Sequence, residues 1–93
     1  MKKVPDIKKN PYVSTYLPIS GHKSVLLTWD EDCNCHTPWN TGMWAHCTAD
    51  AALEDALDWA YAENIPVSID GVIIDLELNP TSLRVAREFI ATT

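Results

Sequence analysis

Three cysteines and two histidines lie close together in the first half of the chain, and their side chains are the usual nitrogen and sulfur ligands of zinc. Residues 33–36 are Cys-Asn-Cys-His, and His46 and Cys47 follow. A structural zinc site takes four such ligands, which Cys33, Cys35, His36, His46 and Cys47 could supply if the intervening loop folds back. Two features oppose this site. Cys-x-Cys is tighter than the usual ligand spacing, and neighbouring residues of a strand point to opposite faces.

The same cluster has three other interpretations. A Cys33–Cys47 or Cys35–Cys47 disulfide would need an oxidising compartment, and the odd number of cysteines argues against a disulfide framework. A thiol–imidazole pair could act as a nucleophile, but it needs an orienting group and an oxyanion hole, for which the sequence has no signature. The most ordinary outcome is a loop histidine and a buried cysteine, so we expect no enzyme activity and no resident cofactor.

Charge divides the chain into unequal parts. Residues 1–23 sum to +4, residues 24–83 to −11 and residues 84–93 to +1, which gives the net charge of −6. No Lys or Arg occurs between Lys23 and Arg84, where eleven carboxylates lie. An anionic body without local compensation favours a cationic partner and opposes the direct binding of nucleic acid.

A row of acids lies on the strongest helix candidate. Asp50, Glu54 and Asp58 follow one another at intervals of four residues, with Asp55 beside them. Each like-charge pair at this spacing costs roughly 0.2–0.5 kcal/mol, and no cation within the helix offsets it. The row is either a solvated helix face, covered by the lysine-rich start of the chain, or a binding face for a basic protein. Carboxylates can imitate a phosphate backbone toward Arg and Lys clusters.

The polar stretch 30–42 is a second candidate for partner binding. It begins with three consecutive acids, Asp30, Glu31 and Asp32. Trp39 follows Pro38 in this stretch and is the best candidate for an exposed aromatic anchor, although it could equally fold under the loop. We expect Trp29 and Trp44 in the core instead.

The elements that position these residues follow from local patterns. Residues 1–11 are basic, contain two prolines and predict a flexible arm, and residues 12–93 predict a single domain. The apolar stretches 12–19 and 23–29, separated by Ser20-Gly21, predict a β-hairpin. Residues 30–42 predict a long loop, and residues 43–48 a third strand.

The second half of the chain has clearer signals. Thr48 predicts the N-cap of a helix that ends near Asn64, before Ile65-Pro66. Asp70-Gly71 predicts a type I′ turn between strands 67–69 and 72–78. Asn79-Pro80 predicts the start of a helix that runs to about Ala91.

Together these elements predict an α+β domain with about four or five strands in a mostly antiparallel sheet and two helices on one face. No apolar run is long enough to span a membrane, so we expect no membrane partner and a cytoplasmic location. An exposed hairpin edge would allow a homodimer by strand pairing.

The leading functional hypothesis is a non-enzymatic, acidic protein-interaction module that binds a basic partner surface. One form would be a small inhibitor of a nucleic-acid-handling complex, of the kind that phages and mobile elements encode. The alternative is a zinc-stabilised structural domain, and a small cysteine-dependent enzyme is the third hypothesis.

Overall fold

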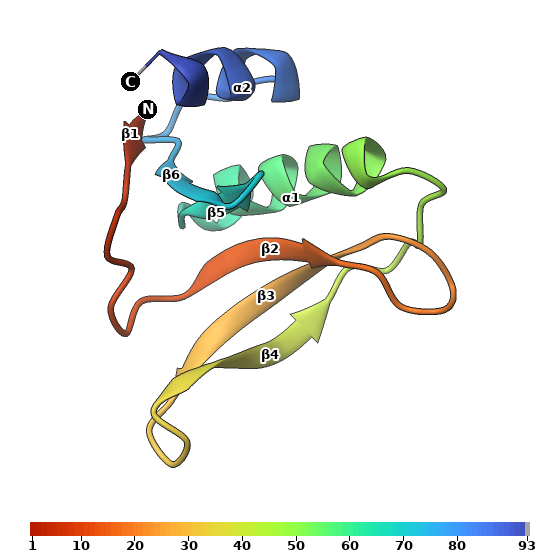
Figure 1. Cartoon of the computed structure of the whole chain (residues 1–93), viewed down its shortest axis with the longest axis vertical. Helices are drawn as coiled ribbons and strands as arrows, with labels where there is room; N and C mark the ends of the chain where they lie inside the picture. Colours follow the sequence, from red (N-terminus) through yellow and green to blue (C-terminus); the bar gives the residue numbers. More distant parts are fainter. Residues whose placement is uncertain (93) are drawn as a thin grey trace.

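The computed structural model, which describes residues 1–92, contains one six-stranded sheet and two helices (Figure 1). The strands are β1 (Lys2–Lys3), β2 (Tyr12–Tyr16), β3 (Lys23–Asp30), β4 (Cys35–Thr41), β5 (Val67–Ile69) and β6 (Val72–Asp75), and the helices are α1 (Ala49–Glu63) and α2 (Leu83–Ala91). The strand order is β1-β6-β5-β2-β3-β4, antiparallel throughout except for the parallel pair β2 and β5. The predicted α+β fold is therefore confirmed, with slightly more strands than expected.

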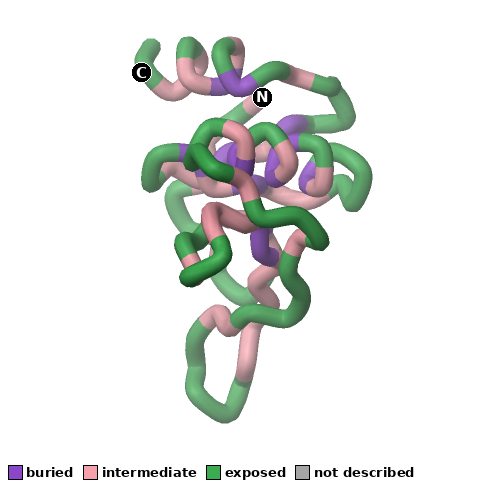
Figure 2. Tube along the Cα trace, turned by 90° about the vertical axis from the view of Figure 1, so that its right-hand side faces the viewer, coloured by how far each residue is buried: buried purple, intermediate pink, exposed green. Residues whose placement is uncertain are grey.

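The core lies between the sheet and the two helices. Val13, Val67 and Ile74 are register partners on neighbouring strands and are fully buried, so they form one apolar row across the sheet. Buried residues of both helices belong to the same cluster, among them Leu53, Ala56, Leu57 and Ala60 of α1 and Leu83 and Ala86 of α2. Figure 2 shows that most of the buried residues gather around α1.

Local capping fixes both ends of α1; the sequence predicted the Thr48 cap and the position of the C-terminal end, which it attributed to Ile65-Pro66. Thr48 Oγ1 accepts a hydrogen bond from the backbone N–H of Ala51 at 3.2 Å. Asn64 adopts the left-handed conformation, with φ of 56°, and its N–H donates to the carbonyl of Ala60. The chain then leaves the helix and enters β5.

The β5–β6 hairpin also follows its sequence signal. Asp70 and Gly71 both have positive φ, as a type I′ turn requires. However, β6 ends at Asp75 and does not extend to Leu78. The Asp75 carboxylate accepts a hydrogen bond from the Glu77 N–H at 2.9 Å, which turns the chain and leaves Leu78 exposed.

The predicted start of the last helix at Asn79-Pro80 is wrong. Ser82 is the N-cap of α2, and its Oγ accepts a hydrogen bond from the Val85 N–H at 3.3 Å. Asn79 instead closes the preceding turn, because its N–H donates to the carbonyl of Leu76 at 3.2 Å. The end of the helix at Ala91 matches the prediction.

The polar stretch 30–42 is not a long loop. Residues 35–41 form the edge strand β4, and residues 31–34 form the turn that joins it to β3. An edge strand pairs on one side only and can therefore accommodate Pro38. The register shifts between Leu26 and Leu27, which leaves Trp39 as the extra residue of a β-bulge.

The predicted strand at residues 43–48 is also wrong. Within the described part of the chain, this segment forms only one isolated bridge, between His46 and His22. In the segment expected to form a flexible arm, Lys2–Lys3 pair with β6, and Lys3 Nζ donates to the carbonyl of Ile90 at 3.0 Å. Lys9 Nζ lies 3.3 Å from a carboxylate oxygen of Glu31.

Candidate functional site

The outward side of α1 carries the predicted row of acids. Asp50, Glu54 and Asp58 are exposed, whereas the neighbouring Asp55 is half-buried. The row thus forms on one helix, as its spacing indicates. The contacts of its members nevertheless differ, and these contacts decide which carboxylates are available to a partner.

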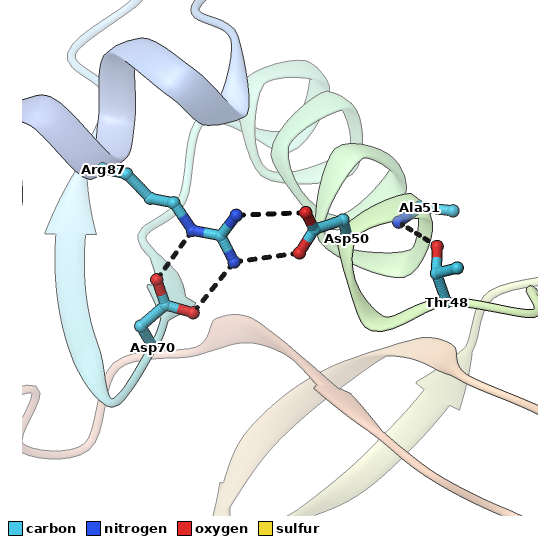
Figure 3. Close-up of polar contacts among 5 residues, drawn as sticks. All are labelled: Thr48, Asp50, Ala51, Asp70 and Arg87. Atoms are coloured by element: carbon cyan, nitrogen blue, oxygen red, sulfur yellow. Dashed lines mark hydrogen bonds and ion pairs between the residues drawn. The ribbon is translucent and has the colours of Figure 1, made fainter.

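Asp50 is bound by an arginine from α2 (Figure 3). The two terminal nitrogens of Arg87 donate to the two oxygens of Asp50 at 3.0 and 3.2 Å. The same guanidinium donates to both oxygens of Asp70, in the β5–β6 turn, at 2.8 and 3.2 Å. Arg87 therefore connects α2 with the first turn of α1 and with the hairpin.

This arrangement shifts the pKa of Asp50 and that of Arg87. The hydrogen bonds from Arg87 lower the pKa of Asp50 below its ordinary value of 3.8. Hydrogen bonds to Asp70 and then to Asp50 raise the pKa of Arg87, so the guanidinium stays charged at every ordinary pH. Asp50 therefore serves the fold and is not a free carboxylate.

Asp55 is also engaged within the molecule. Its carboxylate pairs with the imidazole Nε2 of His46, in the segment between β4 and α1. The backbone of His46 pairs in turn with that of His22, in the segment between β2 and β3. This contact holds the entry to α1 in place and removes Asp55 from the binding face.

Glu54 and Asp58 are the members of the row that remain available. Among residues 1–92 neither carboxylate has a hydrogen bond or an ion pair. Both arginines of the chain are already paired, since Arg84 donates to Glu88 at 2.9 Å and Arg87 to its two aspartates. The negative charge of these two side chains is therefore uncompensated.

A groove runs beside Glu54, between α1 and α2. Its volume is about 600 Å³, and both apolar and charged side chains line it, namely Asp50, Ala51, Glu54, Leu83, Arg84, Arg87, Glu88 and Ala91. Such a groove between two helices can accept an extended or helical segment of a partner. Glu54 is the lining carboxylate that a cation from this partner could meet without first breaking an ion pair.

The second predicted set of binding residues lies elsewhere. Asp30 ends β3, and Glu31 and Asp32 lie in the β3–β4 turn, which is at the bottom of Figure 1 and far from α1. Asp30 accepts a hydrogen bond from the Asp32 N–H at 2.9 Å, and Glu31 pairs with Lys9. Trp39, on the bulge of β4, is 75% exposed, as expected. The structure therefore divides the predicted binding residues between two surfaces.

The predicted zinc ligands are divided in the same way. Cys33 lies in the β3–β4 turn and Cys35 and His36 begin β4, whereas His46 and Cys47 precede α1. The Nε2 of His36 is 2.7 Å from the carbonyl of Asn10, and that of His46 is engaged by Asp55. Within residues 1–92, no three side chains of His, Cys, Asp or Glu lie close enough together to hold a metal ion.

The thiol chemistry of Cys33 is unfavourable for a nucleophile. A hydrogen bond with the Cys35 side chain, desolvation and the nearby charge of Asp30 raise the pKa of Cys33 to about 11. A nucleophilic cysteine needs a lowered pKa, because the thiolate is the reactive form. The three cysteines are exposed, and none forms a disulfide.

The structure also exposes a surface that the sequence analysis missed. Four large apolar side chains in the β2–β3 and β4–α1 connections, Leu17, Ile19, Met43 and Trp44, are 66 to 110% exposed. The expected burial of Trp44 is therefore wrong. The available signal was the position of these residues beside the turn formers Pro18, Gly21 and Gly42, which keep the chain out of regular strands.

Comparisons of the chain with protein-family models, with characterised protein sequences and with solved structures found no match. Neither helix of the described residues is long and apolar enough to cross a membrane.

Proposed function

We propose that this chain is a non-enzymatic protein-interaction module that binds a basic partner through the outward face of α1. The single observation that carries the proposal is the pair of exposed carboxylates, Glu54 and Asp58, which have no partner among residues 1–92. They lie on a helix on which the neighbouring Asp50 and Asp55 are already in contact with Arg87 and His46. The groove beside Glu54 gives the partner a place for apolar contact.

The physical chemistry of this face favours Arg or Lys of another protein. Carboxylates accept charge-assisted hydrogen bonds, and arginine can bind them in a bidentate manner. The surplus of negative charge in residues 24–83 would also attract a basic surface over a longer range and accelerate its association. A basic surface that normally binds nucleic acid fits this description, so inhibition of a nucleic-acid-handling complex is the form that we favour.

The proposal is tested with a charge reversal that leaves the fold contacts intact. The double variant Glu54→Lys/Asp58→Lys changes only carboxylates without a partner in the described structure, and Asp50 is left unchanged because it binds Arg87. A matched control, Asp32→Lys/Glu63→Lys, reverses the same number of charges at two exposed carboxylates that also have no partner among residues 1–92 and that lie outside the row of Asp50, Glu54 and Asp58.

Each immobilised protein is incubated with lysate of the native host and washed with rising salt. The parent and the control should retain a basic protein that high salt releases, whereas the Glu54→Lys/Asp58→Lys variant should not. If all three proteins capture the same partner, or if none captures a basic protein, the face does not have this function.

A further inference from the structure

A second cavity lies beside the segment that joins β1 to β2. Residues 4–11 form this segment, which runs down one side of the sheet (Figure 1). The segment lines the cavity together with Trp29 of β3, Asn34 of the β3–β4 turn and His36 of β4. The volume is about 790 Å³, which is within the range of small-molecule sites. The lining residues lie outside α1, so a ligand bound here is independent of the function proposed for that helix.

Trp29 gives the cavity an aromatic face. Lys9 Nζ lies over the Trp29 ring, 5.9 Å from its centroid, and both residues line the cavity, so this face of the indole is turned toward it. The ring of His36 packs edge to face against Trp29, with 5.2 Å between centroids, and against Tyr12, with 5.0 Å. These contacts hold the indole in one orientation, which favours the stacking of a planar ligand on it.

The Trp29 indole is retained at a cost in stability. Its Nε1 is buried and has no hydrogen-bond partner in the described part of the chain. A buried donor without an acceptor destabilises the fold, and the few such groups in native proteins call for an explanation. The large aromatic face of tryptophan is the property that a stacking ligand would use.

Three polar side chains of the cavity have no partner within residues 1–92. The ammonium group of Lys8 makes no hydrogen bond or ion pair, and neither do the side-chain amides of Asn10 and Asn34. An ammonium group binds phosphate oxygens, and a carboxamide can both donate to and accept from the edge of a nucleobase. The cavity therefore combines a surface for a planar ring with a cation and two amides.

Lys9 supplies a second cation to the same cavity. Its ammonium group lies 3.3 Å from Glu31, but the two side chains are 63 and 69% exposed. Such an exposed ion pair contributes little stability, so a phosphate can replace the carboxylate at Lys9. Asp6, the acid among the described lining residues, accepts a hydrogen bond from the Lys8 N–H at 3.0 Å. With two lysines and one aspartate the lining has a formal charge of +1, in a chain whose net charge is −6.

The surroundings of the cavity favour a single nucleotide over a nucleic-acid strand. Three acids, Asp30, Glu31 and Asp32, lie where β3 meets the β3–β4 turn, and Asn34 of this turn lines the cavity. Phosphates beyond the cavity would meet these carboxylates and the anionic body of residues 24–83. A single phosphate can instead stay close to the two lysines.

We propose that this cavity binds a nucleoside monophosphate. The base stacks on the face of Trp29, and its polar edge meets the side chain of Asn10 or Asn34. The phosphate contacts the ammonium groups of Lys8 and Lys9.

Isothermal titration calorimetry of the purified full chain with adenosine monophosphate (AMP), adenosine and inorganic phosphate separates these contacts. AMP should bind with a Kd between about 10 and about 500 μM, and adenosine about fivefold more weakly because it lacks the phosphate. Lys8→Gln should weaken AMP binding by about fivefold and leave adenosine binding unchanged. Lys23→Gln is the matched control and should change neither affinity, because it removes the same charge at the first residue of β3, whereas Trp29 is near the end of that strand.

Two further variants should change the affinity in opposite directions. Trp29→Leu should weaken the binding of both AMP and adenosine by about tenfold, because the base loses its stacking surface. Glu31→Gln releases Lys9 from its ion pair and should tighten AMP binding by about two- to fivefold, which a disturbed fold would not do. Urea titration shows whether Trp29→Leu remains folded, and Lys8→Gln and Glu31→Gln alter exposed side chains only.

Absence of AMP binding up to about 5 mM would overturn the proposal. It would equally fail if inorganic phosphate bound as tightly as AMP, or if Lys8→Gln weakened adenosine and AMP binding alike. A single strand of about eight deoxyadenosines presents the same chemistry from another source. Tighter binding of this strand than of AMP would reject the single nucleotide as the ligand.

Discussion

The backbone contact between the β2–β3 and β4–α1 loops, where His22 pairs with His46, leads to a prediction about stability, for which the chain has its own control. Gly21 and Gly71 both have positive φ, 123° and 84°, in short connections between strands. They differ in the space around them. A Cβ at Gly21 would meet the carbonyl oxygen of His46 at 2.8 Å, whereas a Cβ at Gly71 would meet nothing within 4 Å.

The two alanine substitutions should therefore have different costs. Gly71→Ala adds only conformational strain, and we expect it to lower the free energy of unfolding by about 1 kcal/mol. Gly21→Ala adds a clash with backbone atoms to a larger strain, so we expect a loss of about 2–4 kcal/mol. This loss is a large part of the roughly 5–14 kcal/mol expected for a domain of this size.

Urea titration followed by tryptophan fluorescence measures both variants, at one protein concentration to exclude effects of association. With an m-value of about 1.5 kcal/mol/M, the midpoint of Gly21→Ala should fall about 1–2 M below that of Gly71→Ala. Equal midpoints, or a lower midpoint for Gly71→Ala, would show that the loops do not meet at His46 as the structure describes.

Four further predictions follow from the same structure. Leu57→Ala removes a side chain that is 2% exposed and should cost about 2–5 kcal/mol, while Trp44→Ser should cost less than about 1 kcal/mol in the same titration. Because Arg87 lowers the pKa of Asp50, the ion pair between these two residues should stabilise the fold fully above about pH 4, and this stabilisation should be lost as the pH falls through the lowered pKa. Arg87→Ala should therefore reduce the acid sensitivity of the melting temperature, measured between about pH 2 and pH 5. With its pKa raised to about 11 from an ordinary 9.0, Cys33 should react with iodoacetamide about tenfold more slowly near pH 8 than an ordinary thiol, because the smaller thiolate fraction outweighs the higher nucleophilicity of the thiolate; peptide mass mapping would detect this. A chelator should leave the melting temperature unchanged, since the five candidate zinc ligands lie at two separate places; a marked decrease would favour the zinc-stabilised domain instead.

Much of the fold was predictable wherever a few neighbouring residues decide the backbone. Thr48 and Asn64 cap α1 through contacts within one turn of the helix. Asp70 and Gly71 form their hairpin turn because both residues tolerate positive φ. Such signals do not depend on distant parts of the chain, so they can be read in the sequence.

The wrong predictions share a different cause. Strand β4 has a polar sequence and forms because β3 supplies a partner, which its own residues do not indicate. Asn79 and Ser82 are both acceptable N-caps, and the turn at Leu76–Asn79 decides between them. In each case the competing alternatives are close in local preference, and a contact outside the segment selects one.

For the candidate site, the sequence by itself determined which residues carry charge and that Asp50, Glu54 and Asp58 share one side of a helix. Only the tertiary structure decided that Arg87 reaches Asp50 from α2, while Glu54 and Asp58 stay without a partner among the described residues. It also decided that large apolar side chains such as Ile19 and Trp44 are exposed in two loops that a backbone bridge joins. The physical reason is that helical spacing is set by the local backbone geometry, whereas ion pairs and exposure depend on how distant segments pack.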